Sequence, residues 1–138
     1  MTALLAEPNL LAAHMGAGII ETYGRMMRCK ASLLAQIAEF DNLGLAQDLG
    51  ATSTGAWLIR RLGISSSTAH EYVAVARQLE NFPYLKMMFE DGKLSYSVVR
   101  LLLKYLTPEN EVELVNRAME LGYHGLEHAL AGLSLIHI

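Results

Sequence analysis

Residues 57–79, WLIRRLGISSSTAHEYVAVARQL, decide the fold. In this stretch Gly63 separates two segments with apolar residues at helical spacing, and glycine is favoured where a chain leaves a helix in the left-handed conformation. Ser65 can then cap the second helix through its hydroxyl. We therefore predict a helix-turn-helix-like unit over about residues 55–80. With Gly63 at the turn, apolar residues occupy the five positions that lock two such helices together: Leu58, Leu62, Ile64, Ala69 and Tyr72.

A helix-turn-helix that binds DNA places the outward face of its second helix in the major groove. Hydroxyls and free N–H groups in the first turn of that helix can hold a phosphate, arginines can pair with phosphates, and a histidine can reach a base edge. Glu71 is expected on the same face, where its carboxylate would repel phosphate. No arginine or lysine stands where guanine would be recognised, so strong sequence specificity is not expected. The candidate DNA-binding residues are Arg60, Arg61, Ser66, Ser67, Thr68, His70 and Arg77.

The rest of the chain has the composition of a helical protein. Leu and Ala contribute 41 residues against 13 for Val and Ile, which favours helix over strand. Hydrophobic residues make up 52% and charged residues 18%, which excludes a disordered chain. We predict an all-α fold, a compact multi-helix domain with Trp57 as an anchor in its core. Apolar spacing, caps and the Gly and Pro positions predict helices over about 19–41, 55–62, 66–79, 83–91, 96–106, 108–121 and 124–131.

Other sequence features exclude several classes of protein. A single cysteine, Cys29, excludes an internal disulfide framework and a cysteine-based zinc site, and it fits a reduced cytosol. No apolar run approaches the roughly 20 residues that span a bilayer, and Glu7 and Pro8 interrupt any secretory signal. His124 and His128 have the spacing of two zinc ligands, but no third ligand accompanies them. We therefore expect a cytoplasmic protein without membrane contact and without a metal site in this chain.

Charge is distributed unevenly, although the net charge is only −3. Residues 1–54 carry three basic and five acidic side chains, and residues 106–138 carry one basic and five acidic ones. Residues 55–105 between them carry seven basic and four acidic side chains. A basic middle segment is a weak indication of a polyanionic partner, and an ordinary solvated surface has the same appearance. Duplex DNA is the partner that we expect for this segment.

Several short motifs follow one another in an order that resembles one bacterial family. They are Trp57–Ser65 (WLIRRLGIS), Ser67–Ala69 (STA), Val75–Leu79 (VARQL), Pro83–Leu85 (PYL), Phe89–Ser95 (FEDGKLS), and Pro108 with Glu111. Over about residues 30–131 the chain resembles the family of the domain of unknown function 222 (DUF222), also called the 13E12 repeat family. In that family the helical domain commonly precedes an HNH endonuclease module, often in mobile or repeated genes. Residues 58–103 more distantly resemble the helix-turn-helix of ParB-like DNA-partitioning proteins, and both resemblances imply DNA as the partner.

The residues of an HNH nuclease itself do not occur in this sequence. Such a nuclease uses one histidine to activate water and a second, with an acidic or amide partner, to hold a divalent metal. Its fold usually carries Cys-x-x-Cys pairs, and this sequence has neither these pairs nor an Asp-His run. We therefore expect no catalytic residue and no cofactor in this chain. The resemblance implies that a divalent metal and the endonuclease activity would belong to an HNH module elsewhere in the full-length protein.

The two ends of the chain are expected to lie outside the folded domain. We expect residues 1–15 to be a loose N-terminal lead-in and residues 16–132 to be a single helical domain. The last six residues, LSLIHI (133–138), are what the end of a transposon-based sequencing adapter encodes in one reading frame. We therefore expect them to be a non-native read-through tail on a truncated fragment.

A second interpretation from a different functional class is a helical interaction module without DNA contact. In this interpretation the apolar helix near residues 19–40 is buried against another protein or against a second copy in a homo-oligomer. An autonomous enzyme is not favoured, because no paired carboxylates, nucleophile–base set or phosphate-cradling glycine loop occurs. Sedimentation together with a DNA-binding measurement separates the first two interpretations.

Overall fold

The computed structural model describes residues 8–136, and every regular element in that range is an α-helix. This confirms the all-α prediction. None of these helices combines the length and the apolar character needed to cross a membrane. In chain order the helices are α2 (Pro8–Asn42), α3 (Leu45–Asp48), α4 (Thr54–Leu62), α5 (Ser66–Leu79), α6 (Pro83–Glu90), α7 (Tyr96–Leu103) and α8 (Glu111–Ile136).

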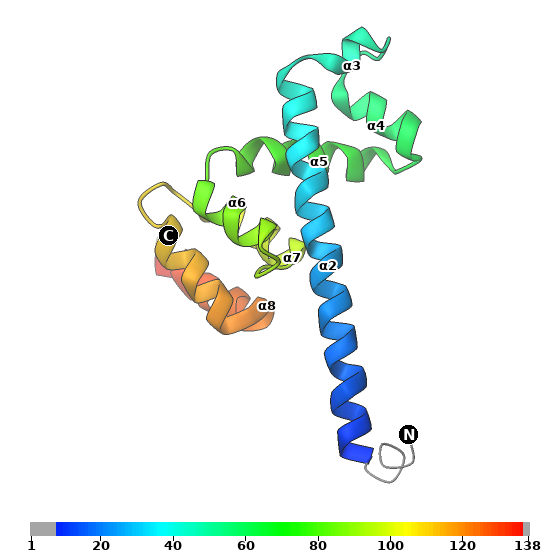
Figure 1. Ribbon diagram of the computed structural model, residues 1–138. Helices are drawn as coiled ribbons and strands as arrows, with labels where there is room; N and C mark the ends of the chain where they lie inside the picture. Colours follow the sequence, from blue (N-terminus) through cyan, green and yellow to red (C-terminus); the bar gives the residue numbers. More distant parts are fainter. Residues whose placement is uncertain (1–7, 137–138) are drawn as a thin grey trace.

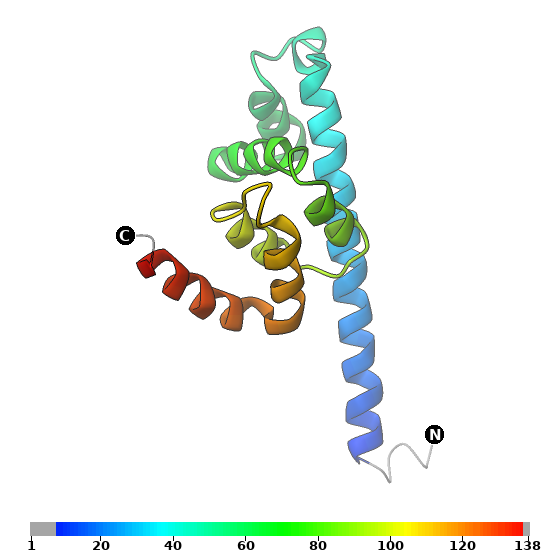
Figure 2. The ribbon, with the colours of Figure 1, turned by 90° about the vertical axis from the view of Figure 1, so that its left-hand side faces the viewer.

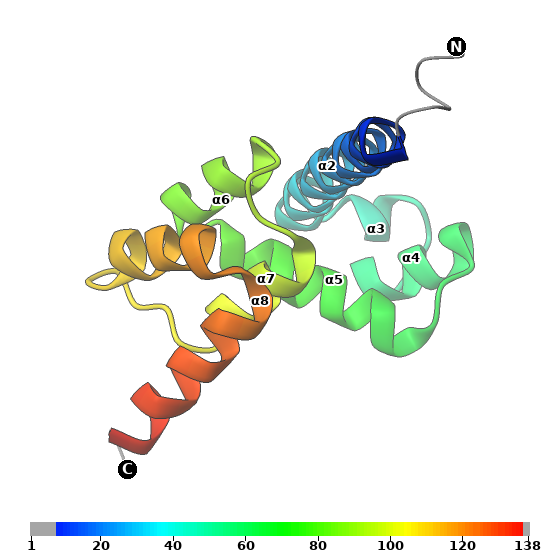
Figure 3. The same cartoon turned by 90° about the horizontal axis from the view of Figure 1, so that it is seen from below.

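Helix α5 lies across the middle of the molecule, and α2, α4, α6 and α7 pack on it (Figure 1). The long helix α2 crosses α5 and also packs on α6. Helices α4 and α7 lie on opposite sides of α5 in both Figure 1 and Figure 2. Helix α8 packs on α6 and α7, and among the described residues it does not contact α2. Seen from below in Figure 3, α2 and α8 therefore stand apart, on different sides of the shorter helices.

The core lies where α2, α5, α6, α7 and α8 meet. The prediction that Trp57 anchors this core is wrong. Among the helices of residues 8–136, α4 packs only on α2, α3 and α5, at one end of the molecule. Trp57 is therefore half-buried, and its ring contacts Phe40 with centroids 4.7 Å apart. The largest side chains that are fully buried are instead Phe89, Leu34, Leu85, Leu102, Leu126, Val99 and Val115.

Helix α2 begins earlier than predicted. Residues 8–15, expected to be part of a loose lead-in, form its first turns. Proline suits the first position of a helix, and the leucine, alanine and methionine residues that follow it favour helix. The rest of the predicted lead-in, residues 1–7, lies outside the described residues, as do residues 137–138 of the predicted tail.

The other differences from the predicted boundaries have local causes. The loop predicted between Gly44 and Gly50 contains the short helix α3, and α7 ends at Leu103 rather than at residue 106. The helix predicted from residue 108 begins at Glu111, because Thr107 and Asn110 first close a turn by exchanging hydrogen bonds of 2.8 and 3.3 Å. The predicted break at Gly122 is present as a kink with φ 70° inside α8, and the helix then continues to Ile136.

Helix α6 is capped by a residue from another part of the chain. Phe82 precedes the helix and provides no capping hydrogen bond, and Pro83 begins its first turn. The carboxylate of Glu111, buried at the start of α8, accepts hydrogen bonds from the backbone N–H groups of Tyr84 (2.8 Å) and Leu85 (3.0 Å). A carboxylate at this place satisfies two unpaired donors and complements the positive end of the helix dipole. The sequence motifs around Pro83 and Glu111 therefore meet in the fold.

Candidate nucleic-acid interface

The connection between α4 and α5 reverses the chain direction within a short turn. Helix α4 ends at Leu62, and Gly63 adopts the left-handed conformation with φ 66° while its N–H donates to the carbonyl of Ile59. Helix α5 then begins at Ser66, and the Ser65 hydroxyl accepts a hydrogen bond from the N–H of Thr68. The turn therefore has the glycine and the serine cap that the sequence predicted, for the predicted physical reasons.

The apolar positions predicted to lock α4 against α5 are only partly buried. Leu58 and Ala69 are in the core, and Ile64 and Tyr72 pack against it. Leu62 is 48% exposed, because it lies at the last turn of α4, where the chain is already turning away. Helices α4 and α5 do pack on each other, and four of the five predicted positions are buried or half-buried.

The outward face of α5 begins with the serine and histidine residues that the sequence predicted to be exposed. At helical spacing its exposed residues are Ser66, Ser67, His70, Ala74, Arg77 and Gln78. His70 lies 2.7 Å from the Ser66 carbonyl oxygen through Nδ1. Because a carbonyl oxygen can only accept a hydrogen bond, Nδ1 is the donor in this contact. Thr68, also predicted to contact DNA, is instead half-buried, and its hydroxyl is bonded to Ser65.

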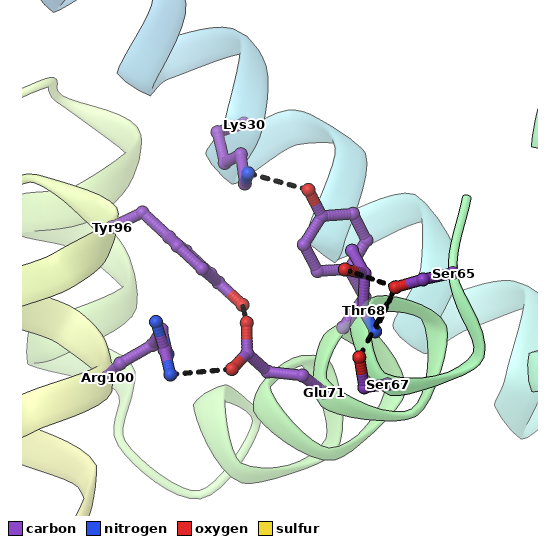
Figure 4. A network of polar contacts seen from close by, with 8 residues as sticks. Lys30, Ser65, Ser67, Thr68, Glu71, Tyr96 and Arg100 are labelled. Carbon is purple, nitrogen blue, oxygen red and sulfur yellow. Dashed lines mark hydrogen bonds and ion pairs between the residues drawn. The ribbon is translucent and has the colours of Figure 1, made fainter.

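Glu71 does not lie free on the outward face, which corrects the prediction from the sequence. Its carboxylate is drawn to the α7 side of α5, where it forms an ion pair with Arg100 at 2.7 Å and accepts a hydrogen bond from the Tyr96 hydroxyl at 3.0 Å (Figure 4). Burial and the bond to Glu71 raise the pKa of Tyr96 far above its ordinary value, so this phenol keeps its proton at all physiological pH values. Arg100 thus balances the negative charge of Glu71, and the Tyr96 hydroxyl is a hydrogen-bond donor to its other carboxylate oxygen.

A cation from α2 lies beside the cluster that Glu71, Tyr96 and Arg100 form. The Lys30 ammonium donates to the Tyr72 hydroxyl at 2.7 Å, and it lies 4.6 Å from the centre of the Tyr72 ring and 4.4 Å from that of Tyr96. Cation–π contacts of this kind stabilise partly buried charges. Figure 4 shows Lys30 above Tyr96 and shows Glu71 and Arg100 below it. The cluster joins α2, α5 and α7 and holds Glu71 in its turned position.

Arg77, a candidate phosphate contact, has a protein partner. Its guanidinium donates to both carboxylate oxygens of Asp41, at 2.7 and 3.1 Å, and the Thr54 hydroxyl donates to the same carboxylate at 2.6 Å. The hydrogen bond from Arg77 holds the pKa of Asp41 below its usual value, against the opposing effect of burial. Asp41 therefore joins the end of α2 to α4 and α5, and Arg77 is a poorer phosphate ligand than its exposure suggests.

The Asp41 junction predicts a pH-dependent loss of stability. We expect Asp41→Asn to lower the free energy of unfolding by about 1 kcal/mol near neutral pH, a modest effect because Arg77 is largely exposed. The carboxyl has a lower pKa in the folded than in the unfolded chain, so its contribution is complete above about pH 4 and is lost as the pH falls through the folded value. Urea unfolding between pH 2.5 and 7 should show the two proteins converging only at acid pH. A difference that grows on acidification would contradict this assignment.

Arg60 and Arg61 are exposed in the last turn of α4, directly before the turn into α5. Within residues 8–136 no carboxylate forms an ion pair with either of them. Sequence reasoning missed two further cations on the other side of α5: Arg100 in α7, and Lys104 directly after it. The available signal was their spacing of four residues on a predicted helix, which places both on one face.

In the described part of the chain no group of three His, Cys, Asp or Glu side chains forms a metal site.

Comparison with protein families agrees with the order of the sequence motifs. The family model described as Domain of unknown function (DUF222) matches residues 21–120, which is 100 of the 138 residues. The match includes the α4–α5 pair and Glu111 with its two hydrogen-bond partners in α6. Neither a search of curated proteins nor a search of solved structures gave a significant match. The chain therefore belongs to the DUF222 family of helical domains of unknown function.

Proposed function

We propose that this chain is a helical module that binds duplex DNA, with little sequence specificity, through α4, the turn after it and the outward face of α5. One observation carries the proposal: Glu71, the acidic residue expected on that face, is instead paired with Arg100 and Tyr96. The first turns of the face present serine hydroxyls, which can donate, beside the His70 ring. Arg60 and Arg61, which form no ion pair within residues 8–136, precede them. Donors without a competing carboxylate are what a phosphate backbone requires.

The DNA-binding proposal predicts a large effect of removing the two arginines of α4. We expect Arg60→Ala/Arg61→Ala to weaken binding to a labelled 25-base-pair duplex by roughly 60-fold at 0.1 M salt, because each lost phosphate contact removes roughly an eightfold factor of counterion release. The slope of log K against log salt should fall in magnitude by about 1.8. Fluorescence anisotropy between about 50 and 200 mM salt measures both quantities, on two unrelated duplex sequences.

A control of equal charge separates a local interface from a general effect of net charge. Arg25→Ala/Arg117→Ala removes the same two charges from exposed positions on α2 and α8, and it should leave the affinity within about twofold of the unchanged protein. If this control weakens binding as much as the α4 variant, the assignment to α4 and α5 is wrong. If the unchanged protein does not bind duplex DNA even at 50 mM salt, the function itself is wrong.

The family resemblance extends the proposal to the intact protein, in which this domain would deliver an HNH nuclease module to DNA. Sequencing the source DNA across the codon for Gly132 tests that extension directly. A reading frame that continues into a His-Asn-His module would support it. A stop codon directly after the codon for Ile138 would contradict it and leave a free-standing binding module.

A second candidate function, self-association, is favoured by the N-terminal half of α2. This half extends beyond the body of the molecule (Figure 1), and between Pro8 and Ile20 it carries no aspartate, glutamate, lysine or arginine. It also carries several large apolar side chains that are 49–75% exposed, an unusual amount for one helix: Leu10, Met15, Ile19, Ile20, Tyr23 and Met26.

A second copy of this chain is the partner that fits the spacing on α2. Met15, Ile19, Thr22 and Met26 follow the alternating spacing of a coiled-coil seam and are symmetric about their midpoint, so an antiparallel copy presents the matching seam. A helix from Pro8 to Leu33 is roughly 39 Å long, and half of its surface is roughly 700 Å², close to the about 800 Å² per partner of a stable interface.

Sedimentation velocity at micromolar concentration should show a dimer of the unchanged protein. Ile19→Glu should convert this dimer to a monomer, because it places a charge in the apolar seam. If the unchanged protein is itself a monomer, self-association through α2 is contradicted.

A further inference from the structure

We propose a second phosphate contact for the DNA complex, in a small cleft between α7 and α8. The inference rests on the proposed DNA binding and adds to it a pair of residues on the opposite side of α5. The cleft, called here the α7 cleft, has a volume of about 110 Å³. That volume is well below the 300–1,000 Å³ of cavities for drug-sized ligands, so it suits a single phosphate group. Its lining residues are Ser97, Arg100, Leu101, Lys104 and Tyr123.

The chemistry of the lining favours an oxyanion. A guanidinium, an ammonium and two hydroxyls can all donate hydrogen bonds, and no carboxylate is among the lining residues. Arginine binds phosphate through paired donors, and lysine binds it as a point charge. Lys104 is exposed at the end of α7, and in residues 8–136 no carboxylate forms an ion pair with it.

Arg100 is held in place and still has donors to offer. One of its terminal nitrogens is bound to Glu71 at 2.7 Å, and its guanidinium carbon lies 5.8 Å from the centre of the Tyr96 ring. The guanidinium has five N–H donors in a fixed plane, so the bond to Glu71 leaves others unused. Half of the side chain is exposed to solvent. Glu71 and Tyr96 are therefore positioning residues for Arg100, and a side chain ordered in advance loses less entropy on binding.

The place of Arg100 in the fold sets it beside the proposed DNA-binding surface. Glu71 lies one turn after Ser67 on the same edge of α5, and its partner Arg100 therefore borders the outward face on the α7 side (Figure 4). The arginines Arg60 and Arg61 belong to α4, which lies on the other side of α5. A helix in the major groove has a phosphate strand on either side. The geometry assigns the two α4 arginines to one strand and Arg100 with Lys104 to the other.

Substitution of Lys104 tests the α7 cleft without disturbing the fold. We expect Lys104→Ala to weaken duplex binding roughly eightfold at 0.1 M salt and to lower the salt slope by about 0.9, equally for unrelated sequences. Lys104→Arg should keep the affinity within about twofold, because it keeps the charge. Arg25→Ala removes one charge from an exposed position on α2 and should also have no more than a twofold effect. Thermal melts should be unchanged for all three variants.

The possible results separate this inference from the proposed function. If Lys104→Ala binds like the unchanged protein while Arg60→Ala/Arg61→Ala binds weakly, the α7 cleft is not a phosphate contact and the proposed function stands. If Lys104→Arg is as weak as Lys104→Ala, charge is not what the position contributes, and the inference is overturned. If the unchanged protein does not bind duplex DNA, the proposed function and the α7 cleft both fail.

Discussion

Replacing Phe89 by alanine is expected to lower the free energy of unfolding by about 3–5 kcal/mol, the largest effect of any single substitution considered for this protein. Phe89 is 1% exposed and has the largest volume among the fully buried side chains. It belongs to α6, which packs on both α2 and α8, so its removal leaves a cavity at the centre of the core. Loss of a buried phenyl ring combines the lost transfer free energy with the cost of that cavity.

Thermal denaturation followed by circular dichroism measures this effect, and a fall in Tm of roughly 10–20 °C is expected for a chain of this length. A folded domain has only about 5–15 kcal/mol of stability to lose, so Phe89→Leu provides a milder test, with an expected cost of about 1–1.5 kcal/mol. Trp57→Ala is the comparison at a half-buried ring, with an expected cost of about 2 kcal/mol. If Trp57→Ala costs more than Phe89→Ala, the centre of the core has been assigned to the wrong place.

Replacing Glu111 by alanine is expected to lower the free energy of unfolding by about 2–4 kcal/mol. The same substitution at an exposed glutamate usually changes it by no more than about 0.5 kcal/mol. The substitution removes the acceptor for two backbone N–H groups at the start of α6. The N–H of Leu85 is buried, so water cannot replace the lost carboxylate there. An unsatisfied buried donor costs about 1–3 kcal/mol, and the loss of helix capping adds to that cost.

The matched control is Glu113→Ala, which removes the same charge from an exposed position two residues further on in the first turn of α8. It should change the free energy of unfolding by no more than about 0.5 kcal/mol. Native-state hydrogen exchange gives a second readout, since the Leu85 amide should lose protection in Glu111→Ala and largely keep it in Glu111→Gln, which retains an acceptor oxygen. Equal effects of Glu111→Ala and Glu113→Ala on urea unfolding would show that Glu111 does not cap α6.

The α4–α5 segment was predictable in detail because its signals are local. The predicted helix over 66–79 agrees with α5 at both ends, and the turn at Gly63 has the left-handed conformation that its position before Ser65 suggested. Each of these features depends on residues within one helical turn of one another. The exposure of Ser66, Ser67 and His70 likewise follows from helical periodicity alone.

The roles of the charged residues in the candidate site were not predictable in the same way. Glu71 has its partners on α7, 25 and 29 positions along the chain, and Arg77 has its partner Asp41 36 positions back. No spacing rule relates residues that far apart. Arg77 was expected to be free to contact phosphate, but its guanidinium is bound to both carboxylate oxygens of Asp41. Glu71 was expected to repel DNA, but its charge is paired with that of Arg100.

By itself the sequence determined that the chain is helical, where the turn between α4 and α5 falls, and which face of α5 is exposed, because propensity, capping and periodicity act within a few residues. It also carried the order of motifs that marks the DUF222 family. Only the tertiary structure decided that Phe89 rather than Trp57 occupies the centre, that Glu111 caps α6, and that Glu71 is paired. These outcomes depend on contacts between helices far apart in the chain, where burial and the pairing of charges are determined by packing.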